Sequence, residues 1–250
     1  GARCRHDRGV RDEMRMRQHA TSAGPPRHHG RALRLLDLFC CAGGAGMGYH
    51  RAGFDEVVGV DIKNRPHYPF EFHQGDALEF VAQHGCEFDV IHASPPCQAF
   101  SQAVKIENRK KRLNLIPATR DALMVTGKPY VIENVPTARK EMLDPVRLCG
   151  SFFGLPIRRH RLFESSVTLW STPCSHREYP AIYEPAWNRV NKLRVLSISG
   201  GYVRGDVDLE THKAAMGIDW EISMPEMSEA IPPAYTEWIG HQLLESVMED

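Results

Sequence analysis

The sequence lacks a net charge, a C-x-x-C pair and long apolar runs. Its 31 basic and 31 acidic residues cancel, which excludes a global field that draws the chain to nucleic acid or membrane, so a polyanion site would need locally clustered charge. No stretch approaches the roughly 20 consecutive apolar residues of a membrane-spanning helix. The N-terminus also lacks the apolar core of a secretory signal. We therefore expect a soluble protein of the cytoplasm with no membrane partner.

The 7 cysteines contain no C-x-x-C pair, and a chain of this length does not need disulfides to hold a core together. This pattern favours free thiols in a reducing compartment. Cys174 and His176, in the run CSH, raise the question of a metal ion. Two ligands without a second pair do not make a metal-binding motif, so we predict no metal site.

Composition divides the chain into three parts. Residues 1–32 are rich in Arg and His and show no apolar period, which predicts a disordered tail. Residues 33–166 and 209–250 carry the regular apolar patterns of a main domain. Residues 167–208 contain Pro, Trp, Tyr and Gly without a helical period, which indicates a small appended region.

Short, β-prone apolar segments follow one another from residue 33 onward. They read LRLLDLFC, EVVGVDI, FDVIHAS, YVIENV, VRLCGSFFG and HRLFESS. Several are apolar on both faces, as is typical of parallel strands that helices cover on both sides. We predict an α/β fold with a mostly parallel, doubly wound, Rossmann-like sheet. Such sheets bind ligands beyond the carboxyl ends of their strands.

Glycines and carboxylates fall at those strand ends. The first strand runs into FCCAGGAGMGYH, where glycines permit a tight turn and close approach to a ligand. The spacing is not G-x-G-x-x-G, so a merely structural turn stays an alternative. Asp61 closes the second strand, where a carboxylate can accept hydrogen bonds from ribose hydroxyls. Asp76 follows the third strand and can accept from an exocyclic amine or simply cap a helix.

The run SPPCQAFS presents Cys97 behind two prolines. Proline fixes its own φ and makes the preceding residue extended, so the cysteine should leave its strand on a stiff, outward spur. We interpret Cys97 as a nucleophile whose pKa nearby positive charge lowers below about 8.5. Positive charge follows at once on the rim where a polyanion would enter, although a solvated helix face is the alternative. The charged residues are Lys105, Arg109, Lys110, Lys111 and Arg112.

Two later segments bring further charged groups to the same crevice. Glu133, near the end of YVIENV, can perform acid–base chemistry beside the thiol. Arg159 and Arg161 share one face if RRHRLFE is extended, and their alternative is a charge pair with Glu164. His92 would be the base of a cysteine hydrolase, but its place in a strand favours a core histidine.

These segments, in this order, make the sequence resemble the DNA cytosine-5 methyltransferases, especially the short bacterial and phage-borne members. The resemblance rests on DLFCCAGGAG, VGVDI, GDALEF, SPPCQAFS, YVIENV, RRHRLFE and AIPPAYTEWIGHQL. It implies an S-adenosylmethionine-dependent methyltransferase fold, with residues 33–166 and 209–250 as the catalytic domain and 167–208 as a target-recognition region. It also implies a monomer that acts on double-stranded DNA in the cytoplasm of a bacterium or phage-infected host.

The resemblance implies roles for particular residues. Cys97 would add to carbon 6 of a flipped-out cytosine, and carbon 5 would accept the methyl group of S-adenosylmethionine. Glu133 would hold or protonate the ring at N3, Arg161 would contact O2, and Arg159 would support the nucleophile's surroundings. The cofactor-binding residues would be Phe39, Gly43, Gly44, Asp61, Ile62, Asp76, Ala77, Pro96 and Glu229. The DNA-binding residues would be Gln98, Ser101, Lys105, Arg109, Lys110 and Arg112.

The sequence departs from the family at three places. Ile157 stands where Gln is usual, and Glu229 stands where an Asn that faces the cofactor is usual, so transfer from a modified S-adenosylmethionine stays open. Region 167–208 is short for target recognition, which predicts a short recognition sequence. A transfer RNA is the alternative substrate, because a flipped cytosine in its loop can enter the same pocket.

Overall fold

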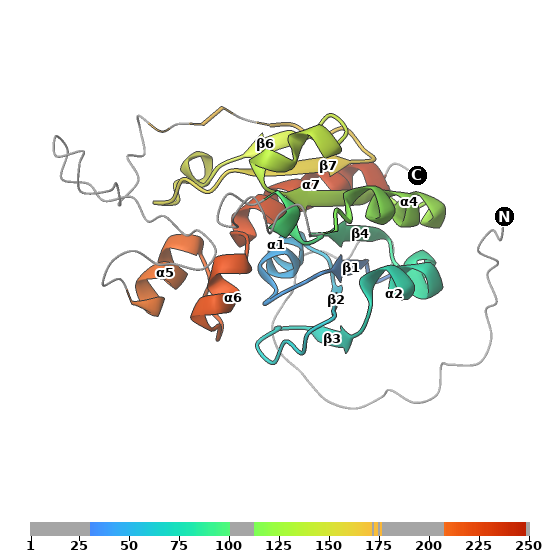
Figure 1. The fold of residues 1–250 in the computed structure, drawn as a ribbon, viewed down its shortest axis with the longest axis horizontal. Coiled ribbons are helices and arrows are strands. Elements are labelled where there is room, and N and C mark those ends of the chain that lie inside the picture. Colours follow the sequence, from blue (N-terminus) through green and yellow to red (C-terminus); the bar gives the residue numbers. More distant parts are fainter. Residues whose placement is uncertain (1–30, 101–112, 172, 175, 177–207, 249–250) are drawn as a thin grey trace.

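The computed structural model describes residues 31–100, 113–171, 173–174, 176 and 208–248. Nearly all of the predicted tail, the basic run 101–112 and most of the predicted target-recognition region therefore lie outside the described residues. A seven-stranded, mostly parallel sheet forms the centre of the described part, with helices on both faces (Figure 1). The predicted fold class is confirmed.

The sheet has the strand order β3-β2-β1-β4-β5-β7-β6. Of the described strands, β7 alone runs opposite to the rest of the sheet, because it pairs antiparallel with both β5 and β6, whereas the other pairs are parallel. The strands are β1 (Arg34–Leu38), β2 (Glu56–Asp61), β3 (Glu71–Gln74), β4 (Val90–Ala93), β5 (Tyr130–Asn134), β6 (Val146–Leu148) and β7 (Arg161–Ser165). The helices are α1 (Gly44–Ala52), α2 (Ala77–His84), α4 (Ile116–Thr126), α5 (Leu209–Met216), α6 (Met224–Glu229) and α7 (Pro233–Met248).

The order of the strands reverses between β1 and β4, which lie side by side and parallel. Chains that leave two such strands diverge to opposite faces and open a crevice at the carboxyl ends. Here the two diverging segments are the glycine-rich turn after β1 and the SPPCQAFS run after β4. The fold alone therefore brings the two most unusual segments of the sequence together.

Neighbouring residues of each central strand enter different apolar clusters. Leu35 and Val90 pack with α1 and α7 on one face of the sheet. Leu36 and Ile91 pack with α2 and α4 on the other face. Each of these side chains is fully buried, and burying an aliphatic side chain contributes about 1.5–3 kcal/mol to stability. This two-sided burial explains why the strands read as nearly continuous apolar runs.

The chain returns after α5 to cover the end of β1. Met216 and Ile222 share a third apolar cluster with Ala42 of the glycine-rich turn. The Trp220 indole also donates a hydrogen bond to the Ala42 carbonyl, at 2.9 Å. Figure 1 shows α5 and α6 side by side at one end of the sheet. This packing carries residues 228–231 to the edge of the sheet where the crevice opens.

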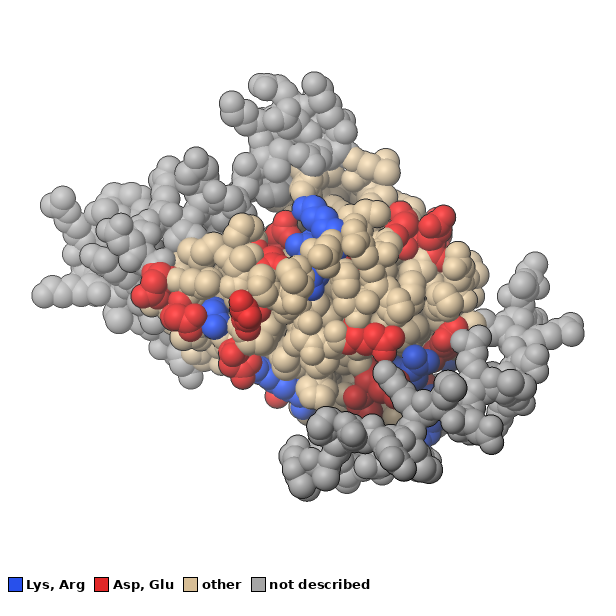
Figure 2. Space-filling model, turned by 90° about the horizontal axis from the view of Figure 1, so that it is seen from below, with Lys and Arg blue, Asp and Glu red and all other residues tan. Residues whose placement is uncertain are grey.

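The described surface mixes charges of both signs. On the face drawn in Figure 2, Lys and Arg lie among Asp and Glu, separated by larger areas of other residues. This agrees with the balanced composition of the chain. Within the described ranges, no helix has the length and apolar character needed to cross a membrane.

Candidate active site

Cys97 begins a short 3₁₀ helix, Cys97–Ala99, directly beyond β4. Pro95 before it is buried, and the side-chain amide of Asn134 donates a hydrogen bond to the Pro95 carbonyl at 2.9 Å. Cys97 itself is half-buried. The neighbouring strand β5 thus holds the proline segment in place, and the thiol is neither sealed in the core nor fully exposed.

Glu133 and Arg161 form an ion pair across neighbouring strands. Glu133 lies on β5, and its Oε1 is 3.0 Å from Nε of Arg161, the first residue of β7. The alignment is not that of a hydrogen bond, so the contact is chiefly coulombic. Ser94 also donates a hydrogen bond to the Glu133 carboxylate. With Glu133 only 7% exposed, this carboxylate is buried and is held by a cation and a hydroxyl group.

The expected alternative, a charge pair between these arginines and Glu164, is wrong. Glu164 is buried and instead pairs with Arg120, with 2.5 Å between Nε and Oε1. Arg159 is also buried, and its Nη2 donates to the carbonyls of Ser228 and Ala230 at 2.7 Å each. It therefore ties the start of β7 to the C-terminal segment that contains Glu229.

The pKa of the Cys97 thiol is raised, contrary to the expected lowering. Burial is the largest cause, and the negative charge of Glu133 adds to it, whereas the positive charges of Arg161 and Arg159 oppose it. Burial likewise raises the pKa of Glu133 against the effect of Arg161. The sequence suggested the opposite for Cys97 because the positive run after it is visible in the sequence, whereas the burial and Glu133 are products of the fold.

The two glycines of this turn that were predicted to bind the cofactor, Gly43 and Gly44, are both buried against other parts of the chain. Gly43 has a φ of +85°, and a Cβ there would lie 2.5 Å from Cδ of Pro69, so only glycine fits. A Cβ on Gly44 would lie 2.3 Å from the carbonyl oxygen of Ile231. Gly44 therefore allows the C-terminal segment to pack closely against the turn. This is the role expected of a merely structural turn, which was the alternative to ligand binding. Phe39 at the end of β1 also has a left-handed φ, of 57°.

Asp61 is buried at the end of β2 and is already well bonded. Its carboxylate accepts from the backbone N–H of Cys41 at 3.1 Å and of Lys63 at 2.9 Å. Arg65 lies 3.0 Å from Oδ2 and also pairs with Glu229 at 3.1 Å. A carboxylate offers about four acceptor positions, so Asp61 keeps room for a further donor. Sequence reasoning missed Arg65, because nothing in its loop signals that it bridges two distant carboxylates.

Asp76 is the N-cap of α2, which confirms the alternative of a helix cap. Its Oδ1 accepts from the N–H groups of Leu78 and Glu79, at 2.8 and 3.1 Å. Oδ2 has no partner in the described part of the chain and can accept from an amine. Ile62, just beyond β2, is 65% exposed and offers an apolar surface to a flat ring. Ala77 is buried in the core and offers only its backbone.

Sequence reasoning also missed Asp37, which lies fully buried in β1 beneath the glycine-rich turn. Its Oδ2 accepts from the Gly46 N–H and the Tyr68 hydroxyl, both at 3.1 Å. No described residue bonds its Oδ1. Burial raises the pKa of Asp37 to about 8 in spite of these two hydrogen bonds. The run RLLDL gives no hint of this, because it reads as an ordinary apolar strand.

His92 is a core histidine, as predicted. It is fully buried, and burial lowers its pKa to about 3, so its ring is neutral. Nδ1 lies 3.0 Å from the Tyr49 hydroxyl, and Nε2 lies 2.9 Å from the Ser94 hydroxyl. If Nδ1 accepts a hydrogen bond from the Tyr49 hydroxyl and Nε2 donates one to the Ser94 oxygen, the Ser94 hydroxyl proton remains available for the hydrogen bond to Glu133. His92 therefore supports Glu133 from within the core.

The remaining predicted residues fall into two groups. Pro96 is exposed, and Gln98 is half-buried beside Cys97. Ser101, Lys105, Arg109, Lys110 and Arg112 lie outside the described residues. Ile157 stands where the family that the sequence resembles usually has Gln. Its side chain is buried in the apolar cluster around Met216 and packs there against apolar residues.

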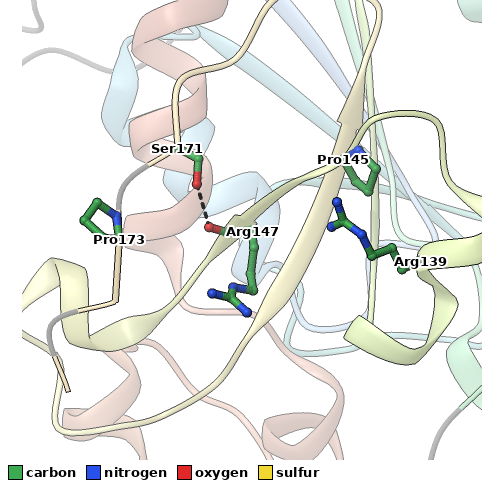
Figure 3. A pocket seen from close by; sticks show the side chains of 5 residues that line it. All are labelled: Arg139, Pro145, Arg147, Ser171 and Pro173. Carbon is green, nitrogen blue, oxygen red and sulfur yellow. Dashed lines mark hydrogen bonds between the residues drawn. The ribbon is translucent and has the colours of Figure 1, made fainter.

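A separate hollow of about 590 Å³ lies beside β6. Its lining residues are Arg139, Pro145, Arg147, Ser171 and Pro173. Figure 3 shows the Ser171 side chain against β6, where its hydroxyl donates to the Arg147 carbonyl at 2.8 Å. None of the predicted site residues lines this hollow, so it is distinct from the crevice at Cys97.

Comparison with known proteins agrees with this arrangement. Residues 33–142 match the family model of the C-5 cytosine-specific DNA methylases. The Type II methyltransferase M1.HphI of Haemophilus parahaemolyticus is 37% identical over 91 residues, which are 30% of this chain and 24% of that protein. M.HgiDI of Herpetosiphon aurantiacus is 31% identical over 160 residues, 52% of this chain and 51% of that protein.

The fold also matches solved methyltransferases. The S. pombe Dnmt2 methyltransferase superposes with a TM-score of 0.55 at 13% identity, over 87% of this chain and 99% of that one. At this identity the likeness shows the fold alone. The chain spans 24% and 51% of the lengths of the two curated relatives above. Over residues 33–142 the chain is thus similar to the C-5 cytosine-specific DNA methylases, and its similarity to a Type II methyltransferase extends over 52% of the chain.

Proposed function

We propose that the protein is a DNA cytosine-5 methyltransferase that uses S-adenosylmethionine. The observation that carries the proposal is that Cys97, Glu133 and Arg161 come together from three separate segments: the ion pair of Glu133 and Arg161 has 3.0 Å between its atoms, and both charges act on the Cys97 thiol beyond β4. The similarity of residues 33–142 to the C-5 cytosine-specific DNA methylases supports the choice of cytosine carbon 5 as the methylated atom. We take double-stranded DNA as the substrate and a monomer as the active form.

Cys97 would act as the nucleophile. Its thiolate adds to carbon 6 of cytosine, forming a carbon–sulfur bond and moving an electron pair toward carbon 5, which alone is too poor a nucleophile. Carbon 5 then gains the methyl group as the methyl–sulfur bond of the donor breaks, which leaves S-adenosylhomocysteine. A base removes the carbon 5 proton, and the bond between carbon 6 and the Cys97 sulfur breaks. Because the target atom is inaccessible inside a duplex, the nucleotide must flip out at a cost of a few kcal/mol.

Glu133 would supply the proton that this addition requires. Its raised pKa favours a protonated carboxyl group that can donate to cytosine N3. Arg161, 3.0 Å from the same carboxylate, can turn to the ring oxygen O2 when the base occupies the site. While Glu133 holds this proton it carries no negative charge, so one cause of the raised Cys97 pKa is absent until the proton passes to N3.

The described residues fit S-adenosylmethionine, which supplies an electrophilic methyl group when bound. Asp61 would accept from the ribose hydroxyls, the free oxygen of Asp76 from the adenine amine, and Ile62 would lie against the adenine ring. Glu229 lies beside this region through its ion pair with Arg65. A modified donor stays the alternative because Glu229 replaces the usual Asn.

Methylation of defined substrates tests the proposal. The protein is incubated with labelled S-adenosylmethionine and unmethylated duplex DNA, and the modified cytosines are then mapped. We expect 5-methylcytosine in duplex DNA, its loss in Cys97→Ser, and its retention in Cys86→Ser, another half-buried cysteine. Label in transfer RNA but not in DNA would reassign the substrate, and label in neither with this donor would contradict the proposed reaction.

A further inference from the structure

A cluster of soft metal ligands lies outside the proposed active site. One ligand atom from each of four residues lies within 4.8 Å of every other. The four residues are Cys149, His160, Cys174 and His176. Cys149 directly follows β6, His160 directly precedes β7, and the other two follow β7 along the chain. Cys149 and His160 thus supply the second pair of ligands for the CSH run. The sequence did not reveal this pair, because both residues are distant from the run in the sequence.

The distances suit a tetrahedral ion. Sγ of Cys149 lies 3.3 Å from Nε2 of His176, and Nε2 of His160 lies 3.3 Å from Sγ of Cys174. Zinc–sulfur and zinc–nitrogen bonds of about 2.3 and 2.0–2.1 Å place a sulfur and a nitrogen ligand about 3.6 Å apart. Small shifts would therefore bring all four atoms to bonding distance of one ion.

The surroundings also resemble those of a structural metal site. Cys149 is 2% exposed, and the Ser151 hydroxyl donates to its sulfur at 3.3 Å, as an outer-shell group does for a metal thiolate. The other three residues are half-buried, which leaves a route for the ion to enter. Both cysteines are free thiols in the structure, so no disulfide competes for their sulfur atoms.

We propose that this Cys₂His₂ cluster binds one zinc ion as a closed structural site. Two thiolates and two neutral imidazoles neutralise the divalent ion and leave no open coordination position for chemistry. Binding would release the two thiol protons to solvent. The inference concerns a site apart from the methyl-transfer residues and goes beyond the proposed function.

The site would link the chain after β7 to the hairpin of β6 and β7. His160 lies directly between Arg159 and Arg161 in the sequence, so a bound ion would also fix the strand start that bears both arginines. Cys174 and His176 stand where the chain enters the region expected to recognise DNA. Zinc would therefore hold that region at a defined distance from Cys97.

Metal analysis of the purified, reduced protein tests the inference without any methylation assay. We expect one equivalent of zinc per chain by plasma mass spectrometry, and its loss in Cys149→Ser and Cys174→Ser but not in Cys86→Ser. Because the two variants can fail to fold, cobalt is also added to the metal-free wild-type protein. Tetrahedral cobalt–thiolate absorption at one equivalent would support the site.

Two results would overturn the inference. One is wild-type protein that folds without zinc and gives no cobalt–thiolate absorption. The other is a Cys149–Cys174 disulfide in protein purified from the cytoplasm, since its sulfur atoms could not then ligate the ion as thiolates. Neither result depends on whether the protein methylates DNA, so the two proposals fail separately.

Discussion

At the scale of single residues, the charges around Cys97 set how much thiolate it forms. Glu133 raises the pKa of the thiol and Arg161 lowers it. We therefore predict that Glu133→Gln lowers this pKa and Arg161→Gln raises it, with each unit worth a tenfold change in thiolate at a pH below the pKa. The measurement is the rate of iodoacetamide alkylation of the Cys97 peptide as a function of pH, by mass spectrometry. Unchanged or slower alkylation of Glu133→Gln at neutral pH would contradict the charge assignment.

The candidate site residues that lie within sequence motifs could be predicted, whereas the surroundings of their side chains could not. Cys97 and Glu133 follow from the proline run and the end of a strand. The buried Asp37, the bridge made by Arg65 and the raised pKa of Cys97 depend on residues brought close only by folding. Local patterns contain no information on such long-range neighbours.

At the scale of elements, the close packing of α1 on α7 explains why residue 48 is a glycine, although no role in ligand binding is assigned to it. A Cβ on Gly48 would lie 2.1 Å from both the Pro233 carbonyl oxygen and Oγ1 of Thr236. We predict that Gly48→Ala destabilises the protein by about 1–3 kcal/mol through overpacking, although alanine favours a helix. Urea unfolding measures the loss.

The matched control is Gly75→Ala in the loop before α2, where a Cβ would meet nothing within 4 Å. Its free energy of unfolding should stay close to that of the wild type. Equal stability of the two variants would contradict the packing of α1 against α7.

The strands could be predicted from the sequence because two-sided burial leaves a strong apolar signal. The antiparallel direction of β7 could not, because direction leaves no mark on that signal.

At the scale of the whole molecule, Asp37 makes stability depend on pH. Its pKa rises from 3.8 to about 8 on folding, so the folded state holds the proton more tightly than the unfolded state. The stability contributed by the protonated carboxyl group is therefore complete below about pH 4 and is lost as the pH rises to about 8. Asp37→Asn, which cannot ionise, should gain stability relative to the wild type across this range, on the order of 5 kcal/mol at most.

The measurement for Asp37→Asn is urea unfolding of both proteins from pH 5 to 9. His92 has the opposite dependence, because its pKa is lowered to about 3 and its stabilisation is lost as the pH falls below 6.5. Its effect is the same in both proteins and cancels in the difference. Parallel stability curves would show that the folded state holds no extra proton at Asp37 over this range, and would contradict the raised pKa.

The central claim is that the Cys97 sulfur adds to the cytosine ring, and trapping tests it most directly. The protein is mixed with S-adenosylmethionine and duplex DNA that contains 5-fluorocytosine, in which fluorine cannot leave as a proton does. We predict a covalent complex joined through Cys97 that survives denaturation, and none with Cys97→Ser even though that variant still binds DNA. A denaturation-resistant complex that forms equally with Cys97→Ser would contradict the account.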